Sequence, residues 1–560
     1  MVRQALCAAA TQWVFKIPPG QNWIHADDNL ADALLRARGH DARFFSAMPS
    51  LIDLDPLPPH PQVEAAIGRI HAAVLQDEVI LICGDYDVDG VSATALLVEG
   101  LSRCGARVLW YVPDRLGEGY GISSQAIAHA VEKKVRLIIS VDCGIADASK
   151  IIRAREAGID VVVTDHHRVP ERLPDAVGIV HPHVYGGRFV GITGVGTAFK
   201  LLRALVQRYY PTVVLTSLLD LVALGTVADV APMIDENRAL VRLGLSVMNT
   251  RLRPGLSALA SLAQRPGPFN EEDIGFVFGP RLNAAGRLDH ASWAVRLLLA
   301  SESEALPLAR RLEQLNEQRK RLMNAIHQQA QTLVAEEQPR ILALAAKGWH
   351  AGVIGIVASK LVEQYGCPVI LMAIEGNVVR GSARSIPEVD LYALLQKCNP
   401  GFLSFGGHAQ AGGFALPLPL LAAFQQRLDE YALSLSATGL GPRVYADAWL
   451  PERFLSLTQA KGLQSLRPFG LGHAEPLFGC RRLRVCGHRI VGNDQKHLKL
   501  NLQSCERNAP GWDGIGFNLA GRMAALGGEL DVLFSLGVNV FNGRESPQLV
   551  VKDLRAAQNT

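Results

Sequence analysis

Short apolar runs rich in β-branched residues recur in the first half of this chain, each followed by a polar turn and a segment of helical character. The runs lie at 79–82, 108–112, 137–141 and 161–163. Continuous apolar strands that alternate with helices are typical of a parallel sheet covered on both faces, because a half-exposed strand would alternate apolar and polar residues. The sequence therefore predicts an α/β fold for this region.

Acidic and imidazole side chains directly follow three of these runs. The segment 84–90 (GDYDVDG) follows the first run, 142–144 (DCG) the third and 165–167 (DHH) the fourth. Ligands of open α/β sheets bind beyond the carboxyl ends of the strands. We therefore expect three loops to bring five Asp and two His to one crevice.

Carboxylates crowded in this way raise one another's pKa unless cations neutralise them. A set of Asp residues with a few His residues suits Mn²⁺ or Mg²⁺. Two such ions can hold both the attacking and the leaving oxygen of a phosphoryl displacement. The pattern therefore predicts two divalent ions and phosphodiester hydrolysis.

Each motif also has a plainer interpretation. Residues 85–90 imitate the start of a calcium-binding loop, but the twelfth position is Leu96 rather than Glu. DCG or HH alone is commonly a turn or a helix cap, and only their placement at successive strand ends favours a metal site. Asp220 lies in an apolar, helix-like stretch, where a carboxylate must be paired or metal-bound. Asp229, at the end of that stretch, fits a helix cap better.

The rest of the chain suggests further domains, as a length of 560 residues allows. Residues 298–337 contain no Gly and one Pro and predict a long helix, whereas the turns at 492–494 and 542–544 indicate a small β-barrel. We expect an N-terminal segment at 1–55, a catalytic α/β domain at 56–297, a connecting helix at 298–338, a second α/β domain at 339–440 and a barrel at 441–560.

Charge and cysteine content bear on the expected binding partners and cellular compartment of the protein. The net charge is only +3, so that a basic surface must come from local clusters, although a solvated charged face would explain each cluster equally well. The clusters are Arg310, Arg311, Arg319, Lys320 and Arg321, and Arg481, Arg482, Arg484 and Arg489. The nine scattered cysteines include no CxxC pair, which favours a reducing cytoplasm. The first 18 residues match neither a signal peptide nor a membrane anchor, and we expect no membrane partner.

Together, these motifs resemble those of the DHH phosphoesterase superfamily, which is named after a motif such as 165–167. Within it, the chain is similar to the RecJ family of exonucleases from about residue 56 to residue 555. The segments that carry this likeness are 279–289 (GPRLNAAGRLD), 349–359 (WHAGVIGIVAS), 406–413 (GGHAQAGG), 468–470 (PFG), 475–478 (EPLF) and 496–499 (KHLK). The resemblance implies a parallel-sheet DHH domain, a long connecting helix, a DHHA1 domain and an oligonucleotide-binding (OB) barrel.

The resemblance also implies roles for individual residues. The implied metal ligands are Asp87, Asp89, Asp142, His166 and Asp220, with Asp142 between the two ions. Asp85 is either a further ligand or a residue that orients one, and His167 donates to the phosphate as charge develops. Some relatives have a His where Cys83 stands, which is a departure at one metal site.

Other residues match the family's substrate contacts. Arg281, Ser382 and Arg384 are implied to bind the 5′ phosphate, and Arg115 and Tyr120 to contact the backbone and stack on a base. His408, which lies among glycines, is implied to contact substrate. Interdomain salt bridges would also explain the arginines, and a core position would also explain His408.

The implied activity is 5′→3′ exonuclease action on single-stranded DNA, releasing mononucleotides in DNA repair and recombination. The implied partners are a single-stranded-DNA-binding protein and a RecQ-type helicase. A relative that cleaves short oligoribonucleotides, cyclic dinucleotides or pyrophosphate is the enzymatic alternative, although such enzymes need only two domains. A non-catalytic DNA-binding scaffold is the other alternative, but here the metal motifs are intact.

Overall fold

The computed structural model describes residues 11–40, 48–115, 117–334, 339–435, 440–492, 495–505, 511–525 and 528–557, with the side chains of 523–525 excepted. Cys7 and two residues of the predicted turn at 492–494, Asn493 and Asp494, lie outside these ranges. The chain forms two compact units. One comprises Met48–Arg321 with Pro468–Ala474, and the other comprises Met1–Ala47, Leu322–Arg467 and Glu475–Thr560.

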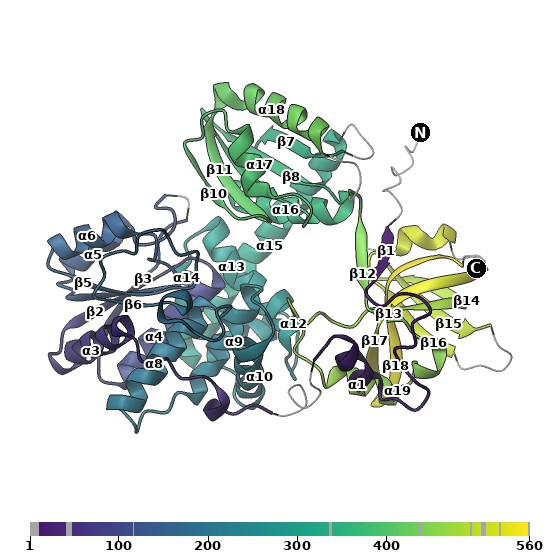
Figure 1. Cartoon of the computed structure of the whole chain (residues 1–560), viewed down its shortest axis with the longest axis horizontal. Coiled ribbons are helices and arrows are strands. Elements are labelled where there is room, and N and C mark those ends of the chain that lie inside the picture. The colour runs from purple at the N-terminus through teal and green to yellow at the C-terminus, as the bar shows by residue number, and fades with distance from the viewer. Residues whose placement is uncertain are drawn as a thin grey trace. The chain divides into compact units, whose positions relative to one another are not determined.

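The unit that contains Met48–Arg321 is built on a five-stranded, entirely parallel sheet (Figure 1). Its strands, in the order β3-β2-β4-β5-β6, are β3 (Arg107–Tyr111), β2 (Val79–Gly84), β4 (Leu137–Val141), β5 (Asp160–Thr164) and β6 (Gly178–Val180). Ile80 and Ile82 of β2 belong to one buried cluster, whereas Leu81 and Cys83 belong to another. Alternate residues therefore enter two separate cores, which confirms the predicted sheet with two covered faces.

Helices flank the strands and fill the rest of this unit. Those within the sheet region are α3 (Pro61–Leu75), α4 (Val88–Arg103), α5 (Ser124–Glu132), α6 (Ala148–Glu156), α7 (Pro182–Tyr185) and α8 (Gly194–Tyr209). Those after it are α9 (Leu219–Ala228), α10 (Asp235–Thr250), α11 (Pro254–Leu262), α12 (Glu271–Asp273), the π-helix η3 (Ile274–Phe278), α13 (Gly279–Leu288) and α14 (Ser292–Leu299). Two 3₁₀ turns are η1 (Leu51–Asp53) and η2 (Thr216–Leu218).

The predicted connecting helix is α15, Glu302–Leu333, with 32 residues. Its one proline, Pro307, is the sixth residue and lies beyond the first turn, so the helix lacks one backbone hydrogen bond there. The boundary between the compact units falls inside this helix, between Arg321 and Leu322.

The second α/β region has a mixed sheet in the order β10-β11-β9-β8-β7. Only the pair formed by β7 and β8 is parallel among these neighbours. Its strands are β7 (Leu342–Lys347), β8 (Val369–Glu375), β9 (Val378–Arg384), β10 (Ser404–Gly407) and β11 (Ala411–Pro417). Its helices are α16 (Ala351–Tyr365), α17 (Leu391–Cys398), η4 (Leu418–Leu420) and α18 (Leu421–Ser434).

The C-terminal region is a closed barrel, as predicted. Its strands are β14 (Phe478–Val491), β15 (His497–Ser504), β16 (Gly511–Gly516), β17 (Glu529–Phe541) and β18 (Arg544–Ala556). They pair in the order β14-β15-β16-β18-β17, and β17 returns to β14. The parallel pair β16–β18 together with this order is the topology of an OB-fold. The predicted turn after β17 is a two-residue hairpin loop, in which Asn542 and Gly543 both have positive φ, as a type I′ turn requires.

The N-terminal segment packs beside the barrel within its own unit. Strand β1 (Gln12–Phe15) pairs with β12 (Arg443–Ala446), and Trp13 Nε1 donates to Asp553 at 2.8 Å. The remaining elements here are α1 (Leu30–Ala37), β13 (Ala448–Trp449), η5 (Glu452–Phe454), α19 (Leu457–Gln464) and η6 (Ala520–Ala525). In the part of the chain that the structure describes, no helix combines the length and apolar character needed to cross a membrane.

Candidate metal centre and substrate contacts

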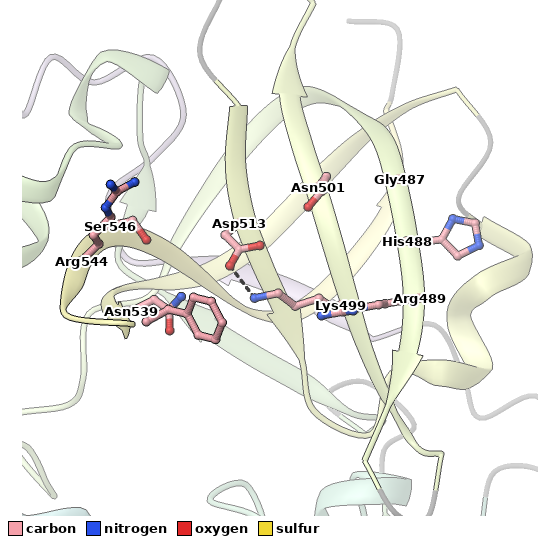
Figure 2. Close-up of a pocket in the computed structure, with 10 residues that line it drawn as sticks. Gly487, His488, Arg489, Lys499, Asn501, Asp513, Asn539, Arg544 and Ser546 are labelled. Atoms are coloured by element: carbon pink, nitrogen blue, oxygen red, sulfur yellow. Dashed lines mark hydrogen bonds and ion pairs between the residues drawn. The ribbon is translucent and has the colours of Figure 1, made fainter.

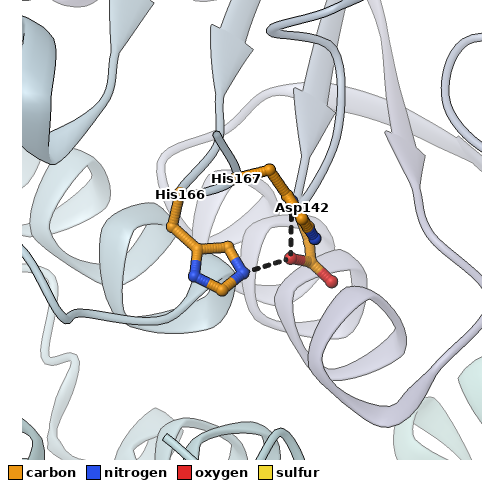
Figure 3. A group of neighbouring side chains, drawn as sticks. All are labelled: Asp142, His166 and His167. Carbon is orange, nitrogen blue, oxygen red and sulfur yellow. Dashed lines mark ion pairs between the residues drawn. The ribbon is translucent and has the colours of Figure 1, made fainter. Parts of the chain in front are cut away.

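The polar residues that follow β2, β4 and β5 meet at one edge of the parallel sheet, as predicted. Figure 3 shows Asp142, from the end of β4, between His166 and His167, from the end of β5. Three overlapping groups have potential ligand atoms within 4.8 Å of one another. They are Asp142 with His166 and His167, Asp89 with His166 and Asp229, and Asp85 with Asp87 and Asp142.

Distances within the groups suit ligands of a shared ion. His166 Nε2 lies 3.1 Å from Asp142 Oδ1 and 3.8 Å from Asp89 Oδ2. Neighbouring ligands of an octahedral ion with bonds of about 2.1 Å lie roughly 3 Å apart. Asp142 belongs to two of the three groups, and its Oδ1 contacts His166, which belongs to the third, so its carboxylate would be placed to serve two ions.

Two of the carboxylates also cap helices. Asp87 Oδ1 accepts from Asp89 N and Gly90 N at the start of α4. Asp89 accepts from Gly194 N at 2.7 Å and from Val195 N at 2.9 Å, at the start of α8. The cap interpretation and the ligand interpretation are thus compatible, because each carboxylate oxygen has a second lone pair.

The remaining buried oxygens test whether a cation fits here. Asp85 and Asp142 are almost fully buried, and the Oδ1 atom of each has no hydrogen-bond partner among the described residues. Burial, and next the charges of Asp87 and Asp89 respectively, hold the pKa of Asp85 and Asp142 well above the usual range. Buried carboxylate oxygens that accept no hydrogen bond from the described residues, one of them in ion-pair contact with His166, match the donor set of Mn²⁺ or Mg²⁺. Cys83 contributes no ligand atom to the three groups and is a buried thiol whose pKa burial raises to about 12.

One glycine is required by the close approach of α8 to the cluster. A Cβ atom on Gly194 would lie 2.5 Å from Asp142 Oδ1 and 2.6 Å from Asp142 Cβ. The first turn of α8 therefore brings amide hydrogens to the acidic cluster, where the positive end of the helix dipole favours negative charge. Sequence reasoning did not single out this glycine.

Asp220 is not part of the cluster, contrary to the expectation from the sequence. Its carboxylate is buried and accepts two hydrogen bonds from Arg253, at 2.9 and 3.1 Å. Asp229 takes the place expected for Asp220, because it follows the last residue of α9 and faces Asp89 and His166. The burial cost that suggested a metal at Asp220 is met by an ion pair instead.

Tyr120 and Asp165 form a second layer around His167. The Tyr120 hydroxyl donates to Asp142 O at 2.9 Å and lies 2.9 Å from His167 Nδ1, which lies 2.7 Å from Asp165 Oδ1. Although burial alone would lower the pKa of His167, the hydrogen bond with Asp165 raises it to about 9. Tyr120 thus lies against the metal cluster rather than as a free stacking platform. From the sequence, Asp165 was expected in the crevice but without an individual role.

Arg115 and Arg281 already have partners within their unit. The Arg115 guanidinium lies 5.0 Å from the ring centroid of Tyr86. Arg281 binds Glu313 through Nε and Nη2 and the Val277 carbonyl through Nη1. The expected phosphate role of Arg281 therefore requires an exchange of Glu313 for the ligand.

Ser382 and Arg384 lie on β9 beside α16. A Cβ atom on Gly355 of α16 would lie 2.7 Å from Ser382 Oγ and 3.2 Å from Arg384 Nη2. Glycine at this position thus lets α16 pack close to both side chains, and Arg384 Nη1 donates to Ser382 Oγ at 3.4 Å. His408 is exposed in the turn between β10 and β11 and accepts from Gln410 N, so it is not a core histidine.

The barrel carries a polar groove of about 670 Å³. Figure 2 shows Lys499 directed towards Asp513 on the neighbouring strand, with which it forms an ion pair. The residues that line the groove are Gly487, His488, Arg489, Lys499, Asn501, Asp513, Asn539, Phe541, Arg544 and Ser546. Arg489 is thus the one member of the second basic cluster that lines the groove, whereas Arg482 pairs with Glu529 and Arg481 lies over the Trp449 ring. Amides, cations and an exposed phenyl ring suit a nucleic-acid strand.

Comparisons with known proteins agree with this architecture. Three family models match: the DHH family, N-terminal domain, at residues 79–226, the DHHA1 domain at 338–434 and the RecJ OB domain at 446–553. The single-stranded-DNA-specific exonuclease RecJ of Bacillus subtilis is 35% identical over 544 residues, which cover 94% of this chain and 68% of that protein.

Two crystal structures of RecJ from Thermus thermophilus are also similar. The complex with Mn²⁺ has a TM-score of 0.82 and 31% identity, covering 98% of this chain and 80% of that one. The complex with Mg²⁺ has a TM-score of 0.77 and 30% identity, covering 98% and 79%. The order of domains, the OB topology and these similarities lead to one conclusion: the chain belongs to the RecJ family.

Proposed function

We propose that the chain is a single-stranded-DNA-specific exonuclease that hydrolyses phosphodiester bonds in the 5′→3′ direction and releases 5′-mononucleotides. The observation that carries this proposal is the cluster at the carboxyl ends of β2, β4 and β5. There, buried carboxylate oxygens that lack a hydrogen-bond partner among the described residues converge on two histidines. The relatives named above are single-stranded-DNA-specific exonucleases. The polarity and the product rest on the family resemblance.

The cluster divides into two sets of ligands. We assign Asp85 and Asp87 to one ion, Asp89, His166 and Asp229 to the other, and Asp142 to both. Asp229 replaces Asp220 in this assignment, because Asp220 is paired with Arg253. Two divalent ions, when bound, polarise a phosphate oxygen and lower the pKa of bound water. Relatives have been crystallised with Mn²⁺ and with Mg²⁺, and either ion fits these donors.

The chain's own residues orient the reaction. Asp165 holds the His167 ring and favours its protonated form, so that His167 can donate to a non-bridging phosphate oxygen. The Tyr120 hydroxyl contacts both the backbone carbonyl of Asp142 and the His167 ring. It therefore holds this carbonyl and this ring in fixed positions relative to each other. Tyr120 is 44% exposed, which leaves part of its ring for contact with the substrate.

We assign the 5′ phosphate to Ser382 and Arg384, supported by their neighbouring positions on β9, where Arg384 Nη1 donates to Ser382 Oγ at 3.4 Å. Arg281 and Arg115 are further candidates for backbone contact, and His408 is exposed for substrate contact. The barrel groove, with Arg489 and Lys499, is proposed to bind the strand away from the reaction.

The family resemblance supports the wider setting. We propose that the enzyme acts in DNA repair and recombination in the cytoplasm, together with a single-stranded-DNA-binding protein and a RecQ-type helicase. The segment boundaries at residues 55, 297, 338 and 440 also stay proposals, because the compact units divide the chain differently.

The deciding experiment uses end-labelled oligonucleotides, single-stranded or double-stranded, with and without a 5′ phosphate. We expect mononucleotides to appear from the 5′ end of single strands, only with Mn²⁺ or Mg²⁺, and fastest with the 5′ phosphate. Cleavage of short oligonucleotides or cyclic dinucleotides without cleavage of longer strands would favour the small-substrate alternative. Binding of single strands without any product would favour the scaffold.

A further inference from the structure

A short segment from the C-terminal part of the chain is built into the unit that contains the metal cluster. This segment, Pro468–Ala474, is here called the strap, and its flanking residues belong to the other unit. Hydrogen bonds attach it, among them Arg238 Nη1 to Pro468 O at 2.6 Å, Phe469 N to Glu271 Oε1 at 2.9 Å and Met233 N to Leu471 O at 2.6 Å. A β-bridge pairs Leu471 with Pro232.

The residues that the strap holds directly follow the proposed ligand Asp229. Only 230–234 separate Asp229 from α10, and the bridge and the Met233 hydrogen bond both fall within them. Fully buried Asn237 donates to Pro232 O at 3.1 Å from the other side. Segment 230–234 is therefore held between α10 and the strap.

This segment contains a strained residue. Val230 has a φ of 56°, although it is β-branched and its side chain is 67% exposed. A left-handed conformation is unfavourable for a β-branched L-residue and persists only where the surroundings impose it. Because most of the Val230 side chain faces solvent, the restraint must come from the residues on either side.

We propose that the strap is a positioning element for the metal ligand Asp229. By fixing Pro232 and Met233, it holds the turn at Val230, and that turn sets where the Asp229 carboxylate lies relative to Asp89 and His166. This inference rests on the proposed ligand set and adds to it a role for a segment that contributes no ligand.

The attachment of the strap uses groups that are costly to bury. Arg238 is 2% exposed, and burial lowers its pKa to about 10. Its buried guanidinium donates a hydrogen bond from Nη1 to the Pro468 carbonyl. Glu271 is 5% exposed, and its carboxylate accepts a hydrogen bond from the Phe469 backbone amide. Charged hydrogen bonds of this kind are stronger than neutral ones, which suits an anchor that must not slide.

The test is a substitution that adds an atom at the contact between the strap and segment 230–234. A Cβ atom on Gly470 would lie 3.0 Å from Met233 Cβ and 3.4 Å from its Cε, so Gly470→Ala should shift the strap by a few tenths of an ångström. Gly68→Ala in α3 is the matched control, because a Cβ there meets nothing within 4 Å. Mn²⁺ binding is measured on the full chain by isothermal titration and by the electron paramagnetic resonance of free Mn²⁺.

We expect Gly470→Ala to weaken one of two Mn²⁺ sites about tenfold and to leave the other unchanged. Turnover should fall at limiting Mn²⁺ and recover at saturating Mn²⁺, and Gly68→Ala should match the wild type. Unchanged Mn²⁺ affinities, or an equal loss at both sites, would overturn the proposal.

A second pair of variants covers the case in which Gly470→Ala does not fold. Glu271→Ala removes the acceptor of the Phe469 amide and should weaken the same site, whereas Glu271→Gln keeps an acceptor and should restore it. Asp229→Asn supplies the reference. If Asp229→Asn leaves Mn²⁺ binding intact, the ligand assignment fails; if it weakens binding and the strap variants do not, the strap proposal alone fails.

Discussion

Arg253 binds both carboxylate oxygens of Asp220, from Nε to Oδ2 at 2.9 Å and from Nη2 to Oδ1 at 3.1 Å. Arg253 also contacts Glu99 and the Leu298 carbonyl, so that this buried pair links α9 to neighbouring elements of its unit. Asp220 was expected to bind metal and Asp229 to cap a helix, but the ion pair with Arg253 makes Asp229, rather than Asp220, the proposed ligand.

The first prediction separates these two aspartates. Asp220→Ala leaves a buried arginine without its main partner and should cost about 3 kcal/mol of unfolding free energy or more, with Mn²⁺ affinity unchanged. Asp229→Asn should lower Mn²⁺ affinity at one site and change stability little. Urea denaturation and Mn²⁺ titration of both variants check this, and a loss of Mn²⁺ affinity in a folded Asp220→Ala protein would return Asp220 to the ligand set.

The second prediction contrasts Asp142 with Asp89. Asp142→Ala should abolish turnover but raise the melting temperature of the metal-free protein at about pH 8, because it removes a buried carboxylate from a repulsive cluster. Asp89→Ala should abolish turnover and also cost about 1 kcal/mol, since Gly194 and Val195 lose their acceptor at the start of α8. Melting curves in EDTA measure both. A lower melting temperature for Asp142→Ala would contradict the crowding argument.

The third prediction concerns the pH dependence of His167 in the metal-free protein. Its pKa is raised to about 9 by Asp165, so the folded state binds this proton more tightly than the unfolded state, whose pKa is about 6.5. The stability that results is complete below about pH 6.5 and is lost as the pH rises through about 9. NMR titration of the His167 ring in EDTA should show the raised value, and Asp165→Asn should bring it down. A titration near the unfolded-state value in the unaltered protein would refute the role of Asp165.

The fourth prediction distinguishes two arginines, Arg384 and Arg281, that the family resemblance implies at the 5′ phosphate. Arg384→Ala should reduce the preference for 5′-phosphorylated strands by about ten- to a hundredfold, which is the loss of one charged hydrogen bond. Arg281→Ala should instead lower stability first, because Glu313 loses its partner. The ratio kcat/KM on strands with and without the phosphate is the measurement. Equal losses on both substrates in Arg384→Ala would indicate general backbone binding.

The fifth prediction tests the barrel groove. Arg489→Ala should weaken binding of long single strands and flatten the plot of log affinity against log salt by about 0.7, the contribution of one phosphate contact. Arg482→Ala is the matched control, since Arg482 is paired with Glu529 outside the groove. Point variants are preferable to truncation near residue 440, which would remove β12 from β1 and the strap from its unit. An unchanged slope in Arg489→Ala would exclude this groove as the strand's path.

The sequence predicted the parallel sheet because each of its long strands is a continuous apolar run, and such runs need no tertiary information to be read. Strand β6 escaped notice, since its three residues, Gly178–Val180, are too short to show a pattern. The loops that carry the acidic and imidazole residues could also be predicted, because these polar residues directly follow the apolar runs.

What could not be predicted depends on partners that are distant in sequence. Asp220 lies in the first turn of α9 and Asp229 directly follows its last residue, and only the position of Arg253, which follows Asp220 by 33 residues, decides between them. Tyr120 was expected to meet the substrate, and nothing in the sequence indicated that its hydroxyl also reaches Asp142 O. Residues 468–470 of the strap belong to a family motif that the sequence shows. Nothing local in Pro468–Ala474, however, indicates that this segment joins the unit of the metal cluster.

The strap also sets an order for synthesis. A ribosome that has reached residue 229 has made every ligand proposed here, yet the unit that holds them lacks its last piece until residue 474 has emerged. Strand β1 likewise waits for β12, whose pairing residues are 431 positions away. Domains generally fold as units during synthesis, but neither unit of this chain can be completed from its N-terminal portion alone. A nascent or prematurely terminated chain is therefore predicted to carry the acidic cluster in a loosened form, which delays nuclease activity until almost the whole protein has been made.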